Sequence, residues 1–304
     1  MLTERYKKLK TVLEEICGAD QVYADEPMSR HTTFKAGGPA ALYVIPSDEK
    51  QLSDVVKSCN AAGVRYYVIG NGSNLLVRDE GFDGVIIEIG KRMSGIDIDG
   101  DELTAQAGAA LAVIASAARD AGLTGLEFAS GIPGNLGGAC VMNAGAYDGQ
   151  MKDVLVSVRL MDRDGEFFEE NADGVDLSYR HSNIPERELT VVSAVMKLQK
   201  GDKEEISSKM KELNARRTQK QPLEYPSAGS TFKRPEGYFA GKLIQDAGMQ
   251  GYSVGGAQVS EKHAGFVINK GGATAGDIIS LTGEVIRVVR EKFGVTLERE
   301  IKIL

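Results

Sequence analysis

Hydrophobic and polar positions alternate with helical spacing at the start of the chain. Between Leu2 and Ile16, apolar side chains recur every three or four positions with charged residues between them. That spacing places them on one face of a helix, which Gly18 is expected to end. Similar patterns predict further helices over residues 49–62, 109–121, 202–217, 239–247 and 274–293.

Short runs rich in β-branched residues predict strands between these helices. They cover residues 65–69, 74–77, 85–89, 103–107, 154–161, 166–169, 190–198, 265–269 and 296–303. Many neighbouring strands are too close in sequence for helical crossovers, so the fold class is predicted as α+β. Residues 123–149 show little periodicity and many glycines, which predicts a long loop of the kind that usually carries function.

Composition supports a globular protein with two domains. The chain has 304 residues, of which 42% are hydrophobic and 26% charged, close to the average for folded domains. At about 150 residues per domain the length predicts two domains, with room for a third small one. The polar stretch near Lys200 to Lys203 is the expected boundary.

Charge, cysteine and histidine usage exclude several function classes. The 43 acidic and 36 basic residues give a formal charge of -7 without a basic block, which argues against nucleic acid and anionic lipid as partners. The three cysteines and three histidines stand far apart, so neither a disulfide framework nor a metal site is expected. No stretch reads as a signal peptide or a membrane span. The expected location is cytoplasmic.

Glycine is the unusual count, at 36 residues. A first glycine element follows a predicted strand and comprises Gly70, Asn71, Gly72, Ser73, Asn74 and Leu75. It lacks the third glycine of a dinucleotide fingerprint, and strand residues follow where a helix is required. Its backbone N–H groups, with the Ser73 and Asn74 side chains, suit a phosphate. An ordinary hairpin turn is the alternative.

A second glycine element extends from Ala129 to Ala146. Its glycines lack side chains, so the backbone is able to lie against a planar or diphosphate ligand. A flexible surface linker fits poorly, because Phe128 and Leu136 require burial. The candidate ligand-binding residues here are Ser130, Gly131, Ile132, Pro133, Gly137, Gly138, Asn143 and Gly145.

Three further segments carry polar candidates. Arg180, within Tyr-Arg-His-Ser, has the planar fork that clamps a carboxylate, although such an arginine is often a surface residue. A turn of small residues presents Ser230 with Lys233 and Arg234 behind it, and a plain turn is the alternative. In the last predicted strand Glu298 and Glu300 share one face. The alternative is that this face is simply exposed to solvent.

Together these motifs, in this order, resemble the UDP-N-acetylenolpyruvoylglucosamine reductase family. The resemblance covers residue 30 to the C-terminus, and the interval between Arg180 and Ser230 is similar to that of the compact variant that lacks an extra tyrosine-bearing loop. It implies an FAD-binding fold of the vanillyl-alcohol-oxidase type in residues 1–200, with lobes at about 20–85 and 86–200 after the opening helix. An α/β substrate-binding domain would follow in residues 201–304.

The resemblance also implies the chemistry. NADPH would reduce non-covalently bound FAD, and the reduced flavin would deliver hydride to the enolpyruvyl group of a sugar nucleotide used in peptidoglycan synthesis. Ser230 would donate the proton, with Arg180 and Glu300 as the other catalytic residues. Glu300 would either donate a hydrogen bond when protonated or fix a neighbouring donor when ionised. Candidate substrate contacts are Tyr179, Tyr225, Lys233, Arg234 and Gln258.

Two other interpretations remain open at this level. One is an FAD oxidase of the same binding fold that acts on an alcohol or lactone. The other is a non-catalytic protein that binds a flavin or sugar nucleotide. Neither has a reason to combine Arg180, Ser230 and Glu300, so the reductase interpretation is favoured. The sequence requires no oligomer.

Overall fold

The computed structural model describes residues 3–147 and 149–304. Its contacts divide the chain into two compact units. Unit 1 contains residues up to Ala24, Leu42–Asn71 and Gly84–Arg216, and unit 2 contains Asp25–Ala41, Gly72–Asp83 and Arg217–Leu304. The functional domain boundaries expected at residues 85/86 and 200/201 stay predictions.

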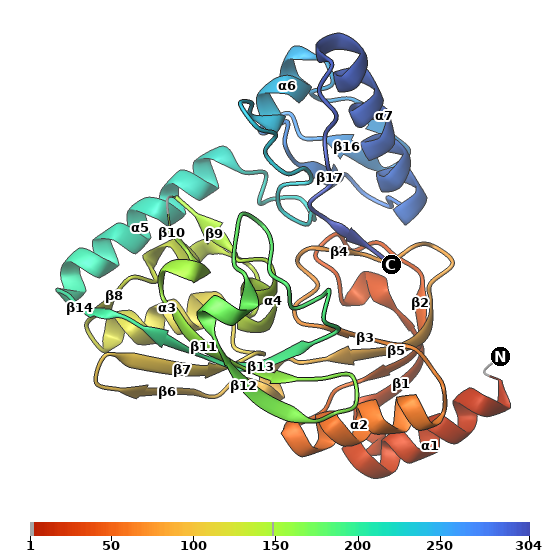
Figure 1. Ribbon diagram of the computed structural model, residues 1–304. Coiled ribbons are helices and arrows are strands. Elements are labelled where there is room, and N and C mark those ends of the chain that lie inside the picture. Colours follow the sequence, from red (N-terminus) through yellow and green to blue (C-terminus); the bar gives the residue numbers. More distant parts are fainter. Residues whose placement is uncertain (1–2, 148) are drawn as a thin grey trace. The chain divides into compact units, whose positions relative to one another are not determined.

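Helices and strands are mixed along the whole chain (Figure 1). The α-helices are α1 (Glu4–Cys17), α2 (Glu49–Ala61), α3 (Leu111–Asp120), α4 (Leu136–Val141), α5 (Lys203–Lys220), α6 (Ala240–Asp246) and α7 (Ala275–Phe293). Short 3-10 helices are η1 (Ala19–Gln21), η2 (Met28–Arg30), η3 (Lys91–Met93), η4 (Glu127–Gly131), η5 (Met151–Asp153) and η6 (Ala172–Val175).

The strands of the first half are β1 (Val22–Pro27), β2 (Pro39–Val44), β3 (Tyr66–Ile69), β4 (Leu75–Leu76), β5 (Phe82–Glu88), β6 (Ile96–Asp99), β7 (Glu102–Gln106), β8 (Leu123–Thr124), β9 (Gly145–Ala146) and β10 (Gly149–Gln150). Those of the second half are β11 (Leu155–Met161), β12 (Phe167–Asn171), β13 (Thr190–Lys197), β14 (Gln199–Lys200), β15 (Ser253–Val254), β16 (Ala257–Val259), β17 (Val267–Asn269) and β18 (Lys302–Ile303).

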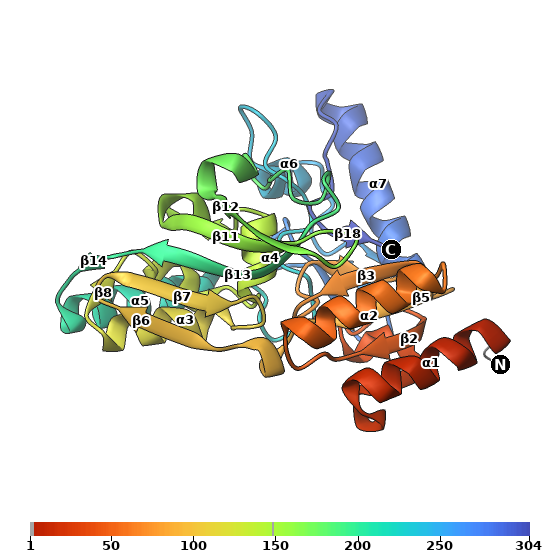
Figure 2. The same ribbon diagram turned by 60° about the horizontal axis from the view of Figure 1, so that its bottom comes forward.

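Unit 1 is built on a five-stranded antiparallel sheet in the order β12-β11-β13-β7-β6. Helix α4 packs on β13, and helices α1 and α2 lie side by side (Figures 1 and 2). The N-cap Asp48 accepts a hydrogen bond from Gln51 N and begins α2, while Gly18, at φ 92°, ends α1. Their apolar faces, including Leu13 and Val55, join one buried core.

A further sheet has the order β1-β2-β5-β3, in which β3 and β5 are parallel. Its strands β1, β2 and β5 each carry the chain from one unit into the other.

Unit 2 places α7 against the three-stranded antiparallel sheet β15-β16-β17. A capping box of Thr274 and Asp277 begins α7. The Asp79 carboxylate also accepts hydrogen bonds from Ala275 N and Gly276 N, at 2.8 and 2.7 Å. Because anions are favoured at a helix N-terminus, this contact fixes the segment that carries β4. Strand β4 in turn pairs in parallel with β18.

The α+β class and every predicted helix are confirmed, but two expectations were wrong. Residues 123–149 are not a plain loop, because Leu136, Ala139 and Cys140 form the buried face of α4. The predicted last strand is reduced to β18. Glu300 N donates to Thr231 O, whereas Lys302 N donates to Asn74 O. The segment thus changes partners midway, which prevents a continuous ladder. The strands that were not predicted are β1, β2, β6, β8, β9, β10, β14, β15 and β16.

The three cysteines are buried thiols. Cys17, Cys59 and Cys140 are buried and form no disulfide. Burial raises the pKa of Cys59 and of Cys140 to about 12, so neither forms the reactive thiolate near neutral pH. Across residues 3–147 and 149–304, none of the helices has the length and apolar character needed to span a membrane.

Candidate functional site

The two glycine elements meet within unit 1. Asn71, at the end of β3, donates a hydrogen bond from Nδ2 to the carbonyl oxygen of Pro133 at 2.7 Å. A Cβ built on Gly70 would lie 3.3 Å from the Cβ of Asn135. The Asn135 amide donates to Gly108 O at 2.6 Å, and this role was not foreseen from the sequence. Gly70 and Asn71, at the start of the first element, therefore lie against the second element.

The first turn of α4 has space beside its backbone. A Cβ on Gly137 would lie 3.0 Å from the Cβ of Ala107, so Gly137 packs closely against Ala107. The neighbouring Gly138 is exposed, and no described atom lies within 4 Å of a Cβ built on it. Because glycine leaves the backbone accessible, this turn fits an anionic or planar group such as part of a dinucleotide.

Other members of the second element are held by internal contacts. Ser130 Oγ donates to Glu127 O at 2.8 Å and accepts from Asn214 Nδ2 at 3.3 Å. Gly131 and Ile132 are half-buried where η4 ends. A Cβ on Gly145 would lie 2.6 Å from Gly149 O. Packing within the chain therefore explains several of these residues without a ligand.

The second half of the first element belongs to unit 2. Gly72 has φ +59°, and a Cβ there would lie 2.0 Å from the carbonyl oxygen of His31. The protein's own backbone thus requires this glycine. Asn74 Nδ2 donates to Glu300 O at 3.1 Å. Ser73 is half-buried, and Leu75 is buried in β4.

Ser230 and Glu300 lie on paired segments of unit 2. Glu300 N donates to Thr231 O at 2.8 Å, and Lys233 N donates to Glu298 O at 2.9 Å. Ser230 is exposed and directly precedes Thr231, which is fully buried. Two catalytic candidates 70 positions apart in sequence are therefore carried by neighbouring stretches of backbone.

Arg299 anchors this C-terminal segment. Its Nε donates to Thr282 Oγ1 on α7 at 2.8 Å, and burial together with the nearby Arg78 lowers the pKa of its guanidinium. Leu297 and Ile301 are buried, whereas Glu298 is exposed and Glu300 is half-buried. Burial therefore follows the alternation expected from the sequence, although residues 297–301 do not form a strand.

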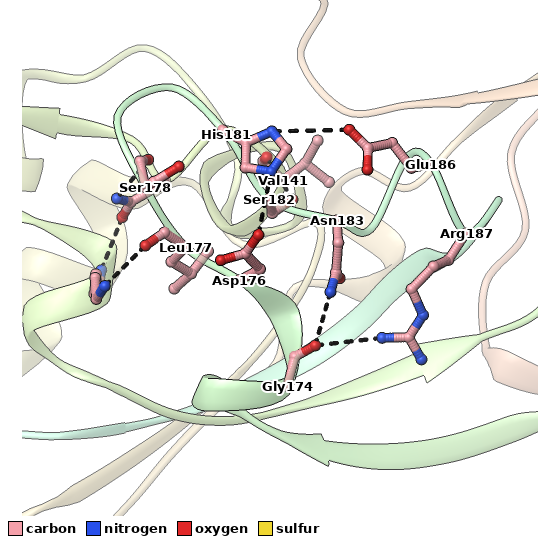
Figure 3. Close-up of polar contacts among 12 residues, drawn as sticks. Val141, Gly174, Asp176, Leu177, Ser178, His181, Ser182, Asn183, Glu186 and Arg187 are labelled. Carbon is pink, nitrogen blue, oxygen red and sulfur yellow. Dashed lines mark hydrogen bonds and ion pairs between the residues drawn. The ribbon is translucent and has the colours of Figure 1, made fainter.

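Arg180 belongs to unit 1 and sits in a tight turn. Its φ is +52°, its Nη2 donates to Gly145 O at 3.0 Å, and its guanidinium lies 5.4 Å from the ring centroid of Tyr179. The neighbouring residues Ser178, His181 and Ser182 are shown in Figure 3. Arg180 thus contacts a backbone oxygen of the second glycine element.

The substrate-contact candidates make polar or cation–π contacts in unit 2, apart from Tyr179, which is exposed in unit 1. Lys233 Nζ lies 2.6 Å from Glu298 Oε1, and Arg234 stacks 4.0 Å over the Phe239 ring. Lys270 Nζ lies 4.8 Å from the Tyr225 ring centroid.

Gln258 is the candidate with unused hydrogen-bonding capacity. Its Nε2 donates to Gly251 O and Ser253 Oγ, both at 3.1 Å. Its Oε1 is buried without a partner among the described residues.

Comparison with known proteins gives consistent matches. Residues 221–304 match the UDP-N-acetylenolpyruvoylglucosamine reductase C-terminal domain, and residues 40–170 match an FAD binding domain. A UDP-N-acetylenolpyruvoylglucosamine reductase of Clostridium botulinum (strain Hall) is 51% identical over 300 residues, which cover 99% of this chain and 98% of the relative.

Solved structures agree. A UDP-N-acetylenolpyruvylglucosamine reductase from Thermus caldophilus has a TM-score of 0.80 at 35% identity, covering 93% of this chain and 98% of that one. The 4-ethylphenol oxidase from Gulosibacter chungangensis, at 17% identity, shares the fold with a TM-score of 0.51 over 65% of this chain and 43% of its own.

These findings define the protein first as an oxidoreductase with an FAD-binding domain, on a fold shared with the 4-ethylphenol oxidase. The predicted fold class is thereby confirmed. The identity over nearly the full length then decides the particular family: the chain belongs to the UDP-N-acetylenolpyruvoylglucosamine reductases.

Proposed function

We propose that this protein uses NADPH to reduce the enolpyruvyl group of UDP-N-acetylglucosamine enolpyruvate to a lactyl ether, giving UDP-N-acetylmuramate for peptidoglycan synthesis. The observation that carries the proposal is the pairing of the Ser230 and Glu300 segments through the 2.8 Å hydrogen bond between Glu300 N and Thr231 O. Near-complete coverage of a relative named for this activity supports it. FAD, when bound, supplies hydride to the substrate.

The chain's own residues would bind the substrate and supply the proton. Reduction of the enolpyruvyl double bond places negative charge on C2 and on the attached carboxylate. The guanidinium of Arg180 would stabilise that charge through two parallel hydrogen bonds. The Ser230 hydroxyl would donate a proton to C2, and it needs no histidine partner because it is not a nucleophile. Glu300 would either donate a hydrogen bond to the enolate when protonated or fix a neighbouring donor when ionised.

Recognition of the sugar nucleotide is proposed for Tyr179, Tyr225, Lys233, Arg234 and Gln258. The free acceptor on Gln258 supports this assignment, because a buried oxygen without a hydrogen bond carries a desolvation cost that a ligand donor removes. Lys233 would have to exchange its ion pair with Glu298 for a substrate anion.

Cofactor binding is proposed for both glycine elements, comprising Gly70, Asn71, Gly72, Ser73, Asn74, Leu75, Ser130, Gly131, Ile132, Pro133, Gly137, Gly138, Asn143 and Gly145. The open space beside Gly138 supports the assignment.

The function is tested by spectroscopy and steady-state kinetics. Purified protein should show flavin absorption bands at close to one FAD per chain, and denaturation should release all of the flavin. NADPH oxidation should accelerate strongly when the enolpyruvyl sugar nucleotide is added. One UDP-N-acetylmuramate should form for each NADPH consumed. NADPH consumption that is insensitive to this substrate would contradict the proposal.

Gly138→Val should give a folded protein with little flavin. A Cβ at this position meets no described atom within 4 Å, so the space beside Gly138 is open in the chain itself. Valine would instead occupy the space assigned to the cofactor. The measurements are flavin absorbance per chain after gel filtration and the melting temperature.

The matched control is Ala112→Val, which adds a comparable volume on the exposed side of α3 in the same unit. It should retain flavin fully. Full occupancy in Gly138→Val would remove this turn from the cofactor site.

A further inference from the structure

The backbone of Arg180 adopts a conformation that needs support. Ser178 N donates to His181 O and His181 N donates to Ser178 O, both at 3.2 Å, so residues 178–181 form a closed turn. Arg180 has φ +52° within it. Residues other than glycine adopt such backbone angles only where the surroundings hold them, and they often do so at functional sites.

Asn143 is a buried amide that contacts this turn. Its residue exposure is 1%. Its Nδ2 donates to Ser178 O and to Gln150 Oε1, both at 3.0 Å, and its Oδ1 accepts from Lys152 N at 2.9 Å. Both amide hydrogens and one oxygen lone pair are therefore used. Its own φ is +41°, which asparagine tolerates better than most residues.

Two further contacts attach the same turn to the same segment. Lys152 Nζ donates to Leu177 O at 2.9 Å, and Ser182 Oγ donates to Val141 O at 2.7 Å. Figure 3 shows the Leu177–Ser178 and Ser182–Val141 sides of this arrangement. Since the Arg180 side chain contacts Gly145 O, residues 141–152 hold both the backbone and the side chain of the arginine.

We propose that Asn143 is a positioning residue for Arg180, in addition to any contact with cofactor. The proposal rests on the proposed role of Arg180 at the substrate carboxylate. The position requires a carboxamide, because one end must donate to Ser178 O while the other accepts from Lys152 N. Aspartate has the same shape and also tolerates positive φ, but its carboxylate repels the carbonyl oxygen of Ser178.

The experiment compares Asn143→Asp with Asn183→Asp in the flavin-loaded enzyme. Asn183 provides a matched control, because its Nδ2 donates to Gly174 O at 2.9 Å, away from the turn (Figure 3). The readouts are hydrogen exchange of the amides in residues 178–182 and stopped-flow rates of the two half-reactions.

In Asn143→Asp we expect the His181 amide to exchange at least tenfold faster. Flavin reoxidation by the enolpyruvyl substrate should slow by about 10- to 100-fold, the size of effect that a small misplacement produces. Reduction by NADPH should change far less. Asn183→Asp should alter neither turn exchange nor reoxidation. Lys152→Met should give a smaller effect in the same direction, which Lys152→Arg restores.

A double-mutant cycle shows whether Asn143 acts through Arg180. In an Arg180→Ala background, Asn143→Asp should cause no further slowing. Equal slowing in both backgrounds, or unchanged exchange of the turn, would overturn the proposal. Should Asn143→Asp fail to fold, Asn143→Gly keeps the positive φ and has the same expected outcomes.

Failure of the proposed function is distinguishable from failure of this inference. If the proposed function is wrong, the enolpyruvyl substrate does not reoxidise the reduced flavin of the wild-type enzyme. The hydrogen-exchange measurement, by contrast, reports directly on the turn at residues 178–181.

Discussion

Ser230→Ala should lower turnover by about 100- to 10,000-fold, the usual contribution of a general acid. Flavin content and reduction by NADPH should stay close to normal, because neither requires this hydroxyl. Ser230→Cys should retain more activity than alanine, since a thiol also donates a proton. Stopped-flow traces at the flavin absorption band measure reoxidation by the enolpyruvyl substrate directly.

The structure supplies a control for this prediction. Ser227→Ala removes the same hydroxyl group three positions earlier in the same loop, and it should leave both half-reactions unchanged. The adjacent Thr231 does not serve as a control, because its buried Oγ1 accepts a hydrogen bond from Val267 N at 2.9 Å and its loss would destabilise the fold. A Ser230→Ala enzyme that reoxidises at the wild-type rate would remove Ser230 from the mechanism.

Arg180→Lys should slow reoxidation by about 100-fold, within the range for loss of one donor to a developing negative charge. Lysine keeps the positive charge but lacks the planar fork that binds a carboxylate in two places. Reduction by NADPH should be nearly intact. The backbone cost of φ +52° applies equally to lysine, so the substitution tests the guanidinium itself.

Arg187→Lys is the matched control. Arg187 donates to Glu170 Oε2 at 2.8 Å and to Gly174 O at 3.4 Å. Its substitution by lysine removes the same guanidinium group, seven positions further along the chain. We expect normal rates in both half-reactions for this variant. Equal losses in both half-reactions of Arg180→Lys would instead indicate that Arg180 has a structural role.

The sequence was sufficient for the elements whose stability is local. Apolar spacing predicted α1, α2 and α7, and Gly18 predicted the end of α1, because a helix satisfies its hydrogen bonds within one segment. The motifs that led to the family could also be recognised in short segments of the sequence. Arg180, Ser230 and Glu300 were named from short patterns, and they still await experiment.

Only the tertiary structure showed which distant segments of the chain lie beside each other. The segment that carries Glu300 pairs first with Thr231 and then with Asn74, and partners so distant in sequence leave no periodic signal. Strand pairing is non-local, so the short strands β15 and β16 were missed and the length of the last strand was overestimated.

The roles of individual glycine and asparagine residues also could not be told from the sequence alone. From the sequence, Gly72 and Gly138 are equivalent candidates, yet the first is required by the His31 carbonyl oxygen and the second faces open space. Asn143 was expected only to bind a ligand, but its amide hydrogen-bonds the turn that carries Arg180. Lys152 was not singled out from the sequence. The sequence determined which residue types are available, and only the packing of distant segments decided what each of them contacts.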